Sequence, residues 1–225
     1  MQLFYSKEIS SSLLLSAEES KHCLKVLRKK ENDIICITDG NGFLYKCKII
    51  TTDKNIVGVK IINTTHTQKN KKIELAISFP KQRNRIEWIV EKATEVGVDI
   101  ITPLICENSE RIKINTERIN KIAISSMKQS LRTYLPKISE IQKFSKFVKT
   151  NKFEQKYIAH CQKDDQKKKI KNIKSKNSCI LIGPEGDFSE EEIKLANNLD
   201  FKSITLSKNR LRTETAAIVA CYDLI

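Results

Sequence analysis

The sequence is poor in the residues that hold metals and disulfide frameworks. It has three histidines and seven cysteines among 225 residues, and no two cysteines stand in a C-x-x-C spacing. Structural zinc sites use closely spaced Cys and His ligands, so the sequence gives no reason to expect a metal. An odd number of scattered cysteines is typical of reduced, mostly buried thiols, which favours a cytoplasmic protein.

Long apolar runs and glycine-rich phosphate loops are also lacking. There is no stretch of about 18 apolar residues, and Leu13-Leu14-Leu15 is too short to serve as one. No basic-then-apolar leader occurs, so we expect neither membrane insertion nor export. The motifs G-x-G-x-x-G and G-x-x-x-x-G-K-[ST] are both missing, and a classical dinucleotide or P-loop phosphate site is therefore not supported.

Positive charge is what the sequence has in excess. It contains 41 Lys and Arg against 27 Asp and Glu, a net charge of +14. Such an excess favours a polyanionic partner, because bound phosphates release counterions. Drift in genome composition is the alternative, since Lys, Ile and Asn are abundant together. The densest basic run, Lys163–Lys176, is predicted to be a solvated loop and helix end, with an RNA contact as the less favoured alternative.

Residues 1–70 are predicted to form a small β-rich barrel. Three segments alternate or run apolar between polar turns and are expected to be strands: Asp33–Thr38, Phe43–Ile50 and Asn55–Asn63. Ser16-Ala17-Glu18-Glu19 is similar to a capping box and predicts a short helix before them. The polar stretch Thr64–Lys72 is expected to be a linker into a second domain.

From residue 71 onward, strand and helix patterns alternate. Ile73–Phe79 and Asp99–Ile105 are predicted strands. Asn84–Gly97 and Asn115–Leu131 are predicted helices, and Gly97 is a typical C-cap. This βαβα order favours an α/β domain with a mostly parallel sheet.

The stretch Ser178–Ser189 is the first candidate ligand site. The apolar run Cys179–Ile182 stops at Gly183-Pro184, and Ser189 with Glu192 predicts a capping box that starts a helix. Ligands of α/β sheets bind outside the carboxyl ends of strands, where glycines let the backbone approach them. An ordinary strand-to-helix turn explains the same residues equally well.

A second stretch of the same kind follows. Phe201–Ser207 is a predicted strand, Lys208–Thr213 a turn, and Thr213–Leu224 a helix with Thr213 as its N-cap. Glu214 falls in the first turn of that helix, where a carboxylate suits the helix dipole. Two consecutive βα units therefore present polar loops at one edge of the predicted sheet.

These two loops carry a family resemblance. The segments GPEGDFSEEE and LRTETAA resemble the C-terminal signature of the SPOUT methyltransferases, and within them the ribosomal RNA small subunit methyltransferase E family, which methylates uridine N3 of 16S rRNA. Further matches follow in the family's order across nearly the whole chain: His22, Val26-Leu27-Arg28, Asp39-Gly40, Tyr45, Lys92–Val98, Arg111, Gln129, Ser130, Arg132 and Pro136.

The resemblance implies a fold, a cofactor and partners. It implies a PUA-like RNA-binding β-barrel over residues 1–70 and a SPOUT domain with a deep trefoil knot over 71–225. It also implies a homodimer, S-adenosylmethionine as methyl donor, and 16S rRNA of the small ribosomal subunit as substrate, with no metal and no membrane. The right-handed crossover rule by itself would argue against any knot.

The resemblance also implies the site residues. The catalytic candidates are Arg212, Glu214 and Arg28. The RNA-binding candidates are His22, Arg28, Lys29, Arg111 and Arg132. The cofactor-binding candidates are Leu181, Ile182, Gly183, Pro184, Glu185, Gly186, Leu206, Ser207, Asn209, Leu211, Arg212, Thr213, Thr215 and Ala216.

Several of these residues have plainer explanations. Uridine N3 holds a weakly acidic proton, so a base must remove it or cations must stabilise the anion on O2 and O4. Glu185 and Glu214 are the available bases, but Glu214 reads slightly better as a helix-dipole carboxylate. His22 reads better as a packed or capping histidine than as a functional group. Arg28 is as consistent with a solvated cluster as with a phosphate contact.

The sequence departs from the family pattern in both loops. Asp187 follows Gly186 where the family has a second glycine. Ser207 and Asn209 change the loop before LRTETA, and an arginine stands one position later, at Arg210. A methyltransferase acting on another RNA, and a non-catalytic RNA-binding relative, are therefore the competing hypotheses.

Overall fold

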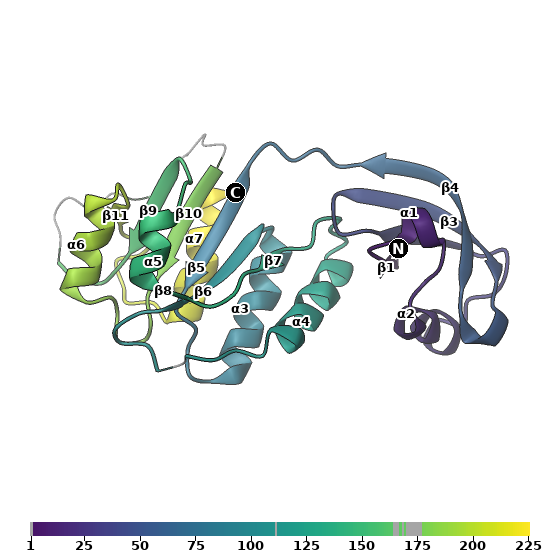
Figure 1. The fold of residues 1–225 in the computed structure, drawn as a ribbon, viewed down its shortest axis with the longest axis horizontal. Helices are drawn as coiled ribbons and strands as arrows, with labels where there is room; N and C mark the ends of the chain where they lie inside the picture. The colour runs from purple at the N-terminus through teal and green to yellow at the C-terminus, as the bar shows by residue number, and fades with distance from the viewer. Residues whose placement is uncertain (1, 111, 164–166, 168, 170–176) are drawn as a thin grey trace. The chain divides into compact units, whose positions relative to one another are not determined.

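The computed structural model describes residues 2–110, 112–163, 167, 169 and 177–225. These divide into two compact units (Figure 1). One contains the residues up to Lys69 together with Ile124–Leu135, and the other contains Asn70–Ala123 and Pro136–Ile225. The sequence predicted a single boundary near residue 70. The segment Ile124–Leu135 departs from that simple division, because it packs with the N-terminal unit.

The first unit is built on one four-stranded sheet in the order β1-β2-β3-β4. Its strands are β1 (Leu3–Tyr5), β2 (Ile34–Thr38), β3 (Phe43–Thr51) and β4 (Gly58–His66). Strand β1 pairs with β2 in parallel, and the other neighbours are antiparallel. Alternate residues of β3, namely Tyr45, Cys47 and Ile49, are buried in the core of this unit. The period-2 pattern therefore places one face of the sheet inside.

Short helical segments complete the first unit. They are α1 (Ile9–Ser12), α2 (Ala17–Lys21), a π-helical turn (His22–Val26) and a 3₁₀ turn (Asp53–Asn55). The hydroxyl of Ser16 accepts the backbone N–H of Glu19, which confirms the predicted start of the helix. Strand β4 continues to His66, however, so the predicted linker Thr64–Lys72 is wrong in its first part. The ladder with β3 pairs Phe43 with His66 and extends the strand.

The second unit contains a parallel sheet, as the βαβα pattern predicted. Its strand order is β11-β9-β10-β5-β6-β7, with β8 beside β6. The strands are β5 (Lys72–Ile77), β6 (Ile100–Ile105), β7 (Lys137–Ile138), β8 (Gln142–Lys143), β9 (Gln155–Ala159), β10 (Asn177–Ile182) and β11 (Lys202–Ile204). All their pairings are parallel. The deep trefoil knot, which the family resemblance implies, stays a prediction.

Helices cover both faces of this sheet (Figure 1). They are α3 (Arg83–Val96), α5 (Phe144–Thr150), α6 (Glu190–Asn198) and α7 (Thr213–Leu224), while α4 (Thr116–Gln129) runs from one unit into the other. Helix α7 packs on β5 and β10 with α3 against it. Helices α5 and α6 form a separate apolar cluster with Cys179 and Leu181 of β10. Because strand residues alternate, Ile180 and Ile182 point to the α7 face.

The ends of helices and strands follow the sequence prediction closely, except at the start of α7 and at the end of β11. Gly97 caps α3 with φ of 105°, and Ser189 with Glu192 forms the full capping box of α6. The predicted N-cap of α7 is wrong: Arg212 occupies that position, and Thr213 is the buried first residue of the helix. Strand β11 ends at Ile204 rather than Ser207. None of the described helices is both long and apolar enough to cross a membrane.

Candidate functional site

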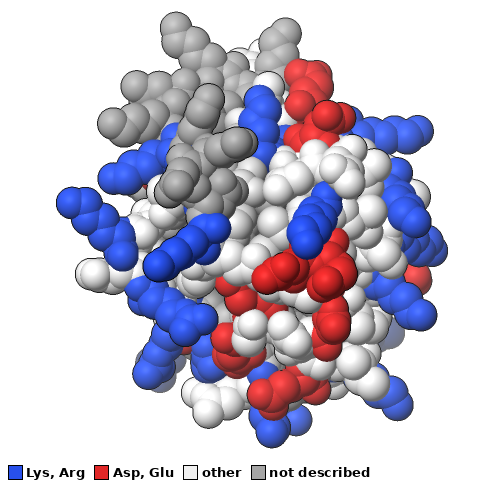
Figure 2. Space-filling model, turned by 90° about the vertical axis from the view of Figure 1, so that its left-hand side faces the viewer, with Lys and Arg blue, Asp and Glu red and all other residues white. Residues whose placement is uncertain are grey.

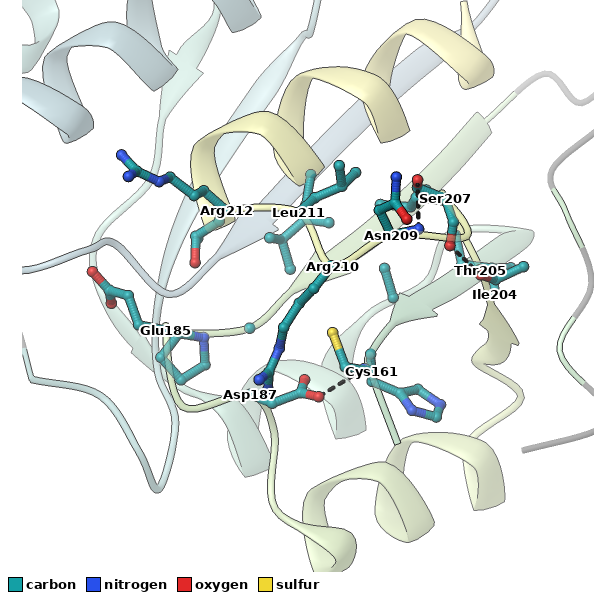
Figure 3. A pocket seen from close by; sticks show the side chains of 18 of the residues that line it. Cys161, Glu185, Asp187, Ile204, Thr205, Ser207, Asn209, Arg210, Leu211 and Arg212 are labelled. Atoms are coloured by element: carbon teal, nitrogen blue, oxygen red, sulfur yellow. Dashed lines mark hydrogen bonds between the residues drawn. The ribbon is translucent and has the colours of Figure 1, made fainter. Parts of the chain in front are cut away.

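A cavity of about 1130 Å³ lies at the carboxyl ends of β9, β10 and β11 (Figure 3). Three loops and the starts of α3 and α7 form it. The loop after β9 contributes His160 and Cys161, the loop after β10 contributes Gly183 to Glu185, and the loop after β11 contributes Thr205 to Arg212. Adjacent parallel strands end at the same edge, which is where α/β proteins bind small molecules. The two predicted loops therefore meet, joined by a third loop that the sequence did not mark.

Most predicted cofactor-binding residues line this cavity. They are Ile182, Gly183, Pro184, Glu185, Leu206, Ser207, Asn209, Leu211, Arg212, Thr213 and Ala216. Leu181, Gly186 and Thr215 are not among the described residues that line it. Leu181 is fully buried in the apolar cluster of α5 and α6 on the other face of the sheet. A side chain of β10 cannot point to both faces, so the side chain of Leu181 does not line the cavity, and a contact of Leu181 with the cofactor stays a prediction.

The two glycines of the first loop differ in their surroundings. A Cβ on Gly183 would lie 3.1 Å from the ring of Phe188, whereas a Cβ on Gly186 would lie 3.2 Å from Cβ of Asn108. The carbonyl of Gly186 also accepts the amide of Asn108 at 3.3 Å. Each glycine therefore makes room for a side chain of the protein, Gly183 for the ring of Phe188 and Gly186 for Asn108, and of the two Gly183 lines the cavity.

Asp187, which departs from the family's glycine, has a definite structural role. Its φ is 65°, in the left-handed region that glycine favours and that aspartate tolerates better than most residues. Its Oδ2 accepts the backbone N–H of Cys161 at 2.7 Å and so ties the loop after β10 to the loop after β9. The side chain of Arg210 runs across the cavity toward Asp187 (Figure 3). Asp187 and Arg210 thus contribute to one wall of the cavity.

The other departures stabilise the loop after β11 from within. The hydroxyl of Ser207 accepts the backbone N–H of Asn209 at 3.1 Å, and the hydroxyl of Thr205 donates to the carbonyl of Ser207 at 3.2 Å (Figure 3). These bonds make a compact turn from side-chain and backbone groups of the loop itself. Ser207 and Asn209 therefore fit a formed cavity wall.

An arginine that the sequence reasoning missed links the two predicted loops. Arg85, in the first turn of α3, donates from Nη1 to Glu185 Oε1 at 2.9 Å and from Nε to Glu214 Oε2 at 2.9 Å. Its Nη2 also contacts Glu214. The side chains of Arg85 and Glu214 are 19% and 13% exposed, so this pair is largely removed from water. The only sequence signal was an arginine at the start of a predicted amphipathic helix.

This contact changes the protonation of Glu214. Burial by itself would raise the pKa of the carboxyl group, but the hydrogen bonds from Arg85 and from the backbone, with the charges of Arg85 and Arg212, outweigh it and hold the pKa below its ordinary value of 4.5. The same pair raises the pKa of Arg85. A carboxylate held by an arginine accepts a proton poorly. The geometry therefore weighs against Glu214 as a general base.

The predicted cationic residues are spread over both units. Arg212 is among the residues that line the cavity, but its guanidinium points away from the interior (Figure 3). Arg28, with φ of 53°, lies with His22 and Lys29 in the first unit, and Arg132 lies in the segment that packs with that unit. Arg111 and most of Lys163–Lys176 lie outside the described residues. The roles of these cations stay predictions.

Charge on one face of the molecule is mixed. Figure 2 shows Lys and Arg side chains around the rim of this face and a band of Asp and Glu across its middle. The net charge of +14 is therefore not gathered into one patch on this side. Within the described part of the chain, no group of three or more His, Cys, Asp or Glu side chains could hold a metal ion.

Comparison with known proteins gives matches over nearly the whole chain. Residues 67–224 match the model of an RNA methyltransferase domain, and residues 15–62 match that of an RNA methyltransferase PUA domain. The chain is 32% identical to ribosomal RNA small subunit methyltransferase E of Aquifex aeolicus, over 97% of this chain and 96% of that protein.

Solved structures agree with these matches. A probable rRNA methyltransferase from Porphyromonas gingivalis is 36% identical, with a TM-score of 0.89 over 98% of this chain and 95% of that one. A ribosomal RNA small subunit methyltransferase E from Neisseria gonorrhoeae, bound to S-adenosylmethionine, is 28% identical, with a TM-score of 0.85 over 98% and 95%.

Proposed function

The chain belongs to the ribosomal RNA small subunit methyltransferase E family, and we propose that it transfers a methyl group from S-adenosylmethionine to N3 of a specific uridine in 16S rRNA. The observation that carries the proposal is the cavity at the ends of β9, β10 and β11. It is built from the same two loops that carry the family signature. A related structure, 28% identical, was solved with S-adenosylmethionine bound.

The residues of the cavity fit such a cofactor. Ile182, Leu206, Leu211 and Ala216 give it apolar walls suited to an adenine ring, and the ends of the strands supply backbone N–H and C=O groups for polar atoms. Gly183 lines the cavity with main-chain atoms alone, because it has no side chain. S-adenosylmethionine supplies an electrophilic methyl group on a sulfonium. The loops around the cavity would bring the acceptor nitrogen close to that methyl group.

We assign the N3 proton to solvent water, because Glu214 is held by Arg85, and cations near the base would stabilise the uracil anion that remains. We assign Arg212, at the cavity rim with its guanidinium directed away from the interior, to stabilising the negative charge that develops on O2 and O4 of a uracil bound outside the cofactor cavity. Arg28, in the first unit, stays a catalytic candidate from the family resemblance. Glu214 is assigned a structural role, because Arg85 holds it in an ion pair and lowers its pKa. Its charge fixes the N-terminus of α7, and thereby the position of Arg212.

Large apolar side chains on α3 and α7 support a homodimer. Trp88 of α3 and Tyr222 of α7 are 41% and 71% exposed, although the two helices pack on each other. Exposed aromatic residues on adjacent helices are typical of a protein interface. Light scattering of the purified chain should give the mass of two copies, about twice 25.9 kDa. A monomer at micromolar concentration would contradict this assignment.

Purified protein tests the proposal directly. Calorimetry should show stoichiometric binding of S-adenosylmethionine, and incubation with unmodified small ribosomal subunits and radiolabelled cofactor should label 16S rRNA. Nuclease digestion should then release the label as N3-methyluridine. Cofactor binding with label in another nucleoside would favour a methyltransferase of different specificity. No cofactor binding at all would leave the non-catalytic RNA-binding hypothesis.

A further inference from the structure

Three aromatic rings from distant parts of the sequence meet on the first unit. Phe43 begins β3 and pairs with His66, which ends β4, and their ring centroids lie 4.4 Å apart. The ring of Tyr134 stands edge-on to His66 at 6.5 Å. We call Phe43, His66 and Tyr134 the ring cluster. No pattern in the sequence marks it, because the third ring comes from the segment between the two parts of the second unit.

The backbone holds Tyr134 firmly in this position. Asn41 and Tyr134 form an antiparallel bridge, and the N–H of Gly42 donates to the carbonyl of Thr133 at 2.9 Å. The hydroxyl of Tyr134 donates to the carbonyl of Thr67 at 2.7 Å. Gly42 has φ of 98°, and a Cβ there would lie 2.5 Å from the tyrosine ring. The ring cluster is therefore a built feature that requires glycine at this position.

The rings stay accessible to solvent despite these contacts. Phe43 is 37% exposed, and His66 is exposed as well. Rings that only close the end of a sheet would be expected to bury their faces, since burial is what stabilises them. Exposed aromatic faces at the end of a rigid ladder instead form a surface on which a flat partner can stack.

Positive charge lies beside the ring cluster. Lys69 Nζ is 5.4 Å from the centroid of the Tyr134 ring, and Arg132 precedes Tyr134 by two positions in the chain. Residues 1–69 carry 11 Lys and Arg against 7 Asp and Glu. The segment Ile124–Leu135 adds Lys128 and Arg132 and no acidic residue. Aromatic faces next to cations suit an unpaired nucleobase with its flanking phosphates.

We propose that the ring cluster is a stacking site for one unpaired base of the RNA, with Lys69 and Arg132 at the adjoining phosphates. This inference rests on the proposed function, because it gives the first unit its part in holding the substrate. It adds a specific contact that charge alone does not supply, since stacking needs the base and not the phosphate.

The test compares two probes of equal charge. A fluorescein-labelled 12-nucleotide oligouridine and an abasic ribose-phosphate strand of the same length are titrated with the full chain. The parent should bind oligouridine several-fold more tightly than the abasic strand. Phe43→Ala with His66→Ala should weaken oligouridine binding about 10-fold, the scale for one lost base–aromatic stack, and leave abasic binding unchanged.

Matched variants separate stacking from charge and from misfolding. Phe43→Tyr keeps a ring and should keep affinity, and Ile50→Ala removes an exposed apolar side chain from the same strand and should have no effect. The double variant Lys69→Ala, Arg132→Ala should reduce the slope of log K against log[salt] by about 1.4, because each phosphate contact with a single strand contributes about 0.7. Calorimetry with S-adenosylmethionine checks that the second unit is intact in every variant.

Two results would overturn the proposal. Equal affinity of the parent for oligouridine and the abasic strand would show that no base is stacked. Unchanged oligouridine affinity of the double variant Phe43→Ala, His66→Ala would show that the ring cluster takes no part in RNA binding. A change in the oligomeric state of that variant would show instead that the ring cluster is a protein interface. Cofactor binding and methylation of small subunits by the parent would still support the proposed function in either case.

Discussion

Replacing Arg85 is the perturbation whose outcome the structure predicts in most detail. Arg85→Ala leaves the carboxylates of Glu185 and Glu214 without their shared cation at the lip of the cavity. Breaking a buried ion pair costs about 3–5 kcal/mol, and one hydrogen bond to a charged group about 1.5–3 kcal/mol. The Glu185 side chain remains 34% exposed, so water screens its pairing with Arg85. We therefore expect Arg85→Ala to lower the free energy of unfolding by about 2 kcal/mol.

Urea unfolding followed by tryptophan fluorescence measures this loss, because Trp88 lies in α3 with Arg85. With a slope of about 3 kcal/mol/M, the midpoint should fall by roughly 0.7 M. Arg118→Ala is the matched control: Arg118 pairs with Glu87, but its side chain is 53% exposed. Exposed pairs contribute little, so the control should scarcely move the midpoint. An equal fall of the midpoint in Arg85→Ala and Arg118→Ala would show that burial of the Arg85 ion pair adds no stability.

A second substitution identifies the cause of the loss. Arg85→Ala with Glu214→Gln should recover part of the stability, because the uncompensated charge is removed. The stabilisation from Glu214 should also depend on pH in a defined direction. Its pKa is lowered in the folded state, so the stabilisation is present above the ordinary carboxyl value of 4.5 and is lost as the pH falls through the folded value. A parent-minus-variant difference that grew on acidification would contradict the assignment.

The remaining predictions concern the cavity itself. Gly183→Ala should weaken S-adenosylmethionine binding about tenfold, a loss of roughly 1.4 kcal/mol, because its Cβ would displace the ring of Phe188 and with it the loop that lines the cavity. Gly186→Ala, whose Cβ would meet Asn108 away from the cavity lining, should leave binding within twofold, and calorimetry decides between them. Arg212→Ala should lower turnover by roughly 10²-fold with cofactor affinity unchanged, as expected for a charge that acts in the transition state; a change in affinity alone would argue against that role. Glu214→Gln should give the parental pH–rate profile, and recovery of its activity at high pH would restore Glu214 as the base. Asp187→Ala should cost about 1–3 kcal/mol of stability, since φ of 65° disfavours alanine and the bond to the neighbouring loop is lost; an unchanged unfolding midpoint would count against it.

The sequence predicted what is decided by residues close together in the chain. The apolar run Cys179–Ile182, the capping box at Ser189 and the C-cap at Gly97 each depend on a few neighbours, and all appear as expected. Two such βα units in succession also placed their loops at one sheet edge, which located the cavity. The sequence prediction did not use the strand register, so it did not foresee that the side chain of Leu181 lies in the apolar cluster of α5 and α6.

What the sequence missed depends on contacts between distant segments. Arg85 meets Glu214 from another helix, and no local pattern distinguishes it from Arg83, the other arginine of α3. The ring cluster joins Phe43 and His66 to Tyr134 in the same way, through a segment that the pattern assigned to the second domain. Such contacts follow from the fold, and periodicity carries no information about them.

The most direct test of the central claim is the location of N3-methyluridine in small-subunit RNA. RNA from cells that lack this protein, from cells complemented with the parent and from cells complemented with Arg212→Ala is digested and mapped by mass spectrometry. The account predicts one N3-methyluridine in 16S rRNA that disappears without the protein, returns with the parent and is absent or strongly reduced with Arg212→Ala. Persistence of that nucleoside in the cells that lack the protein would contradict the account.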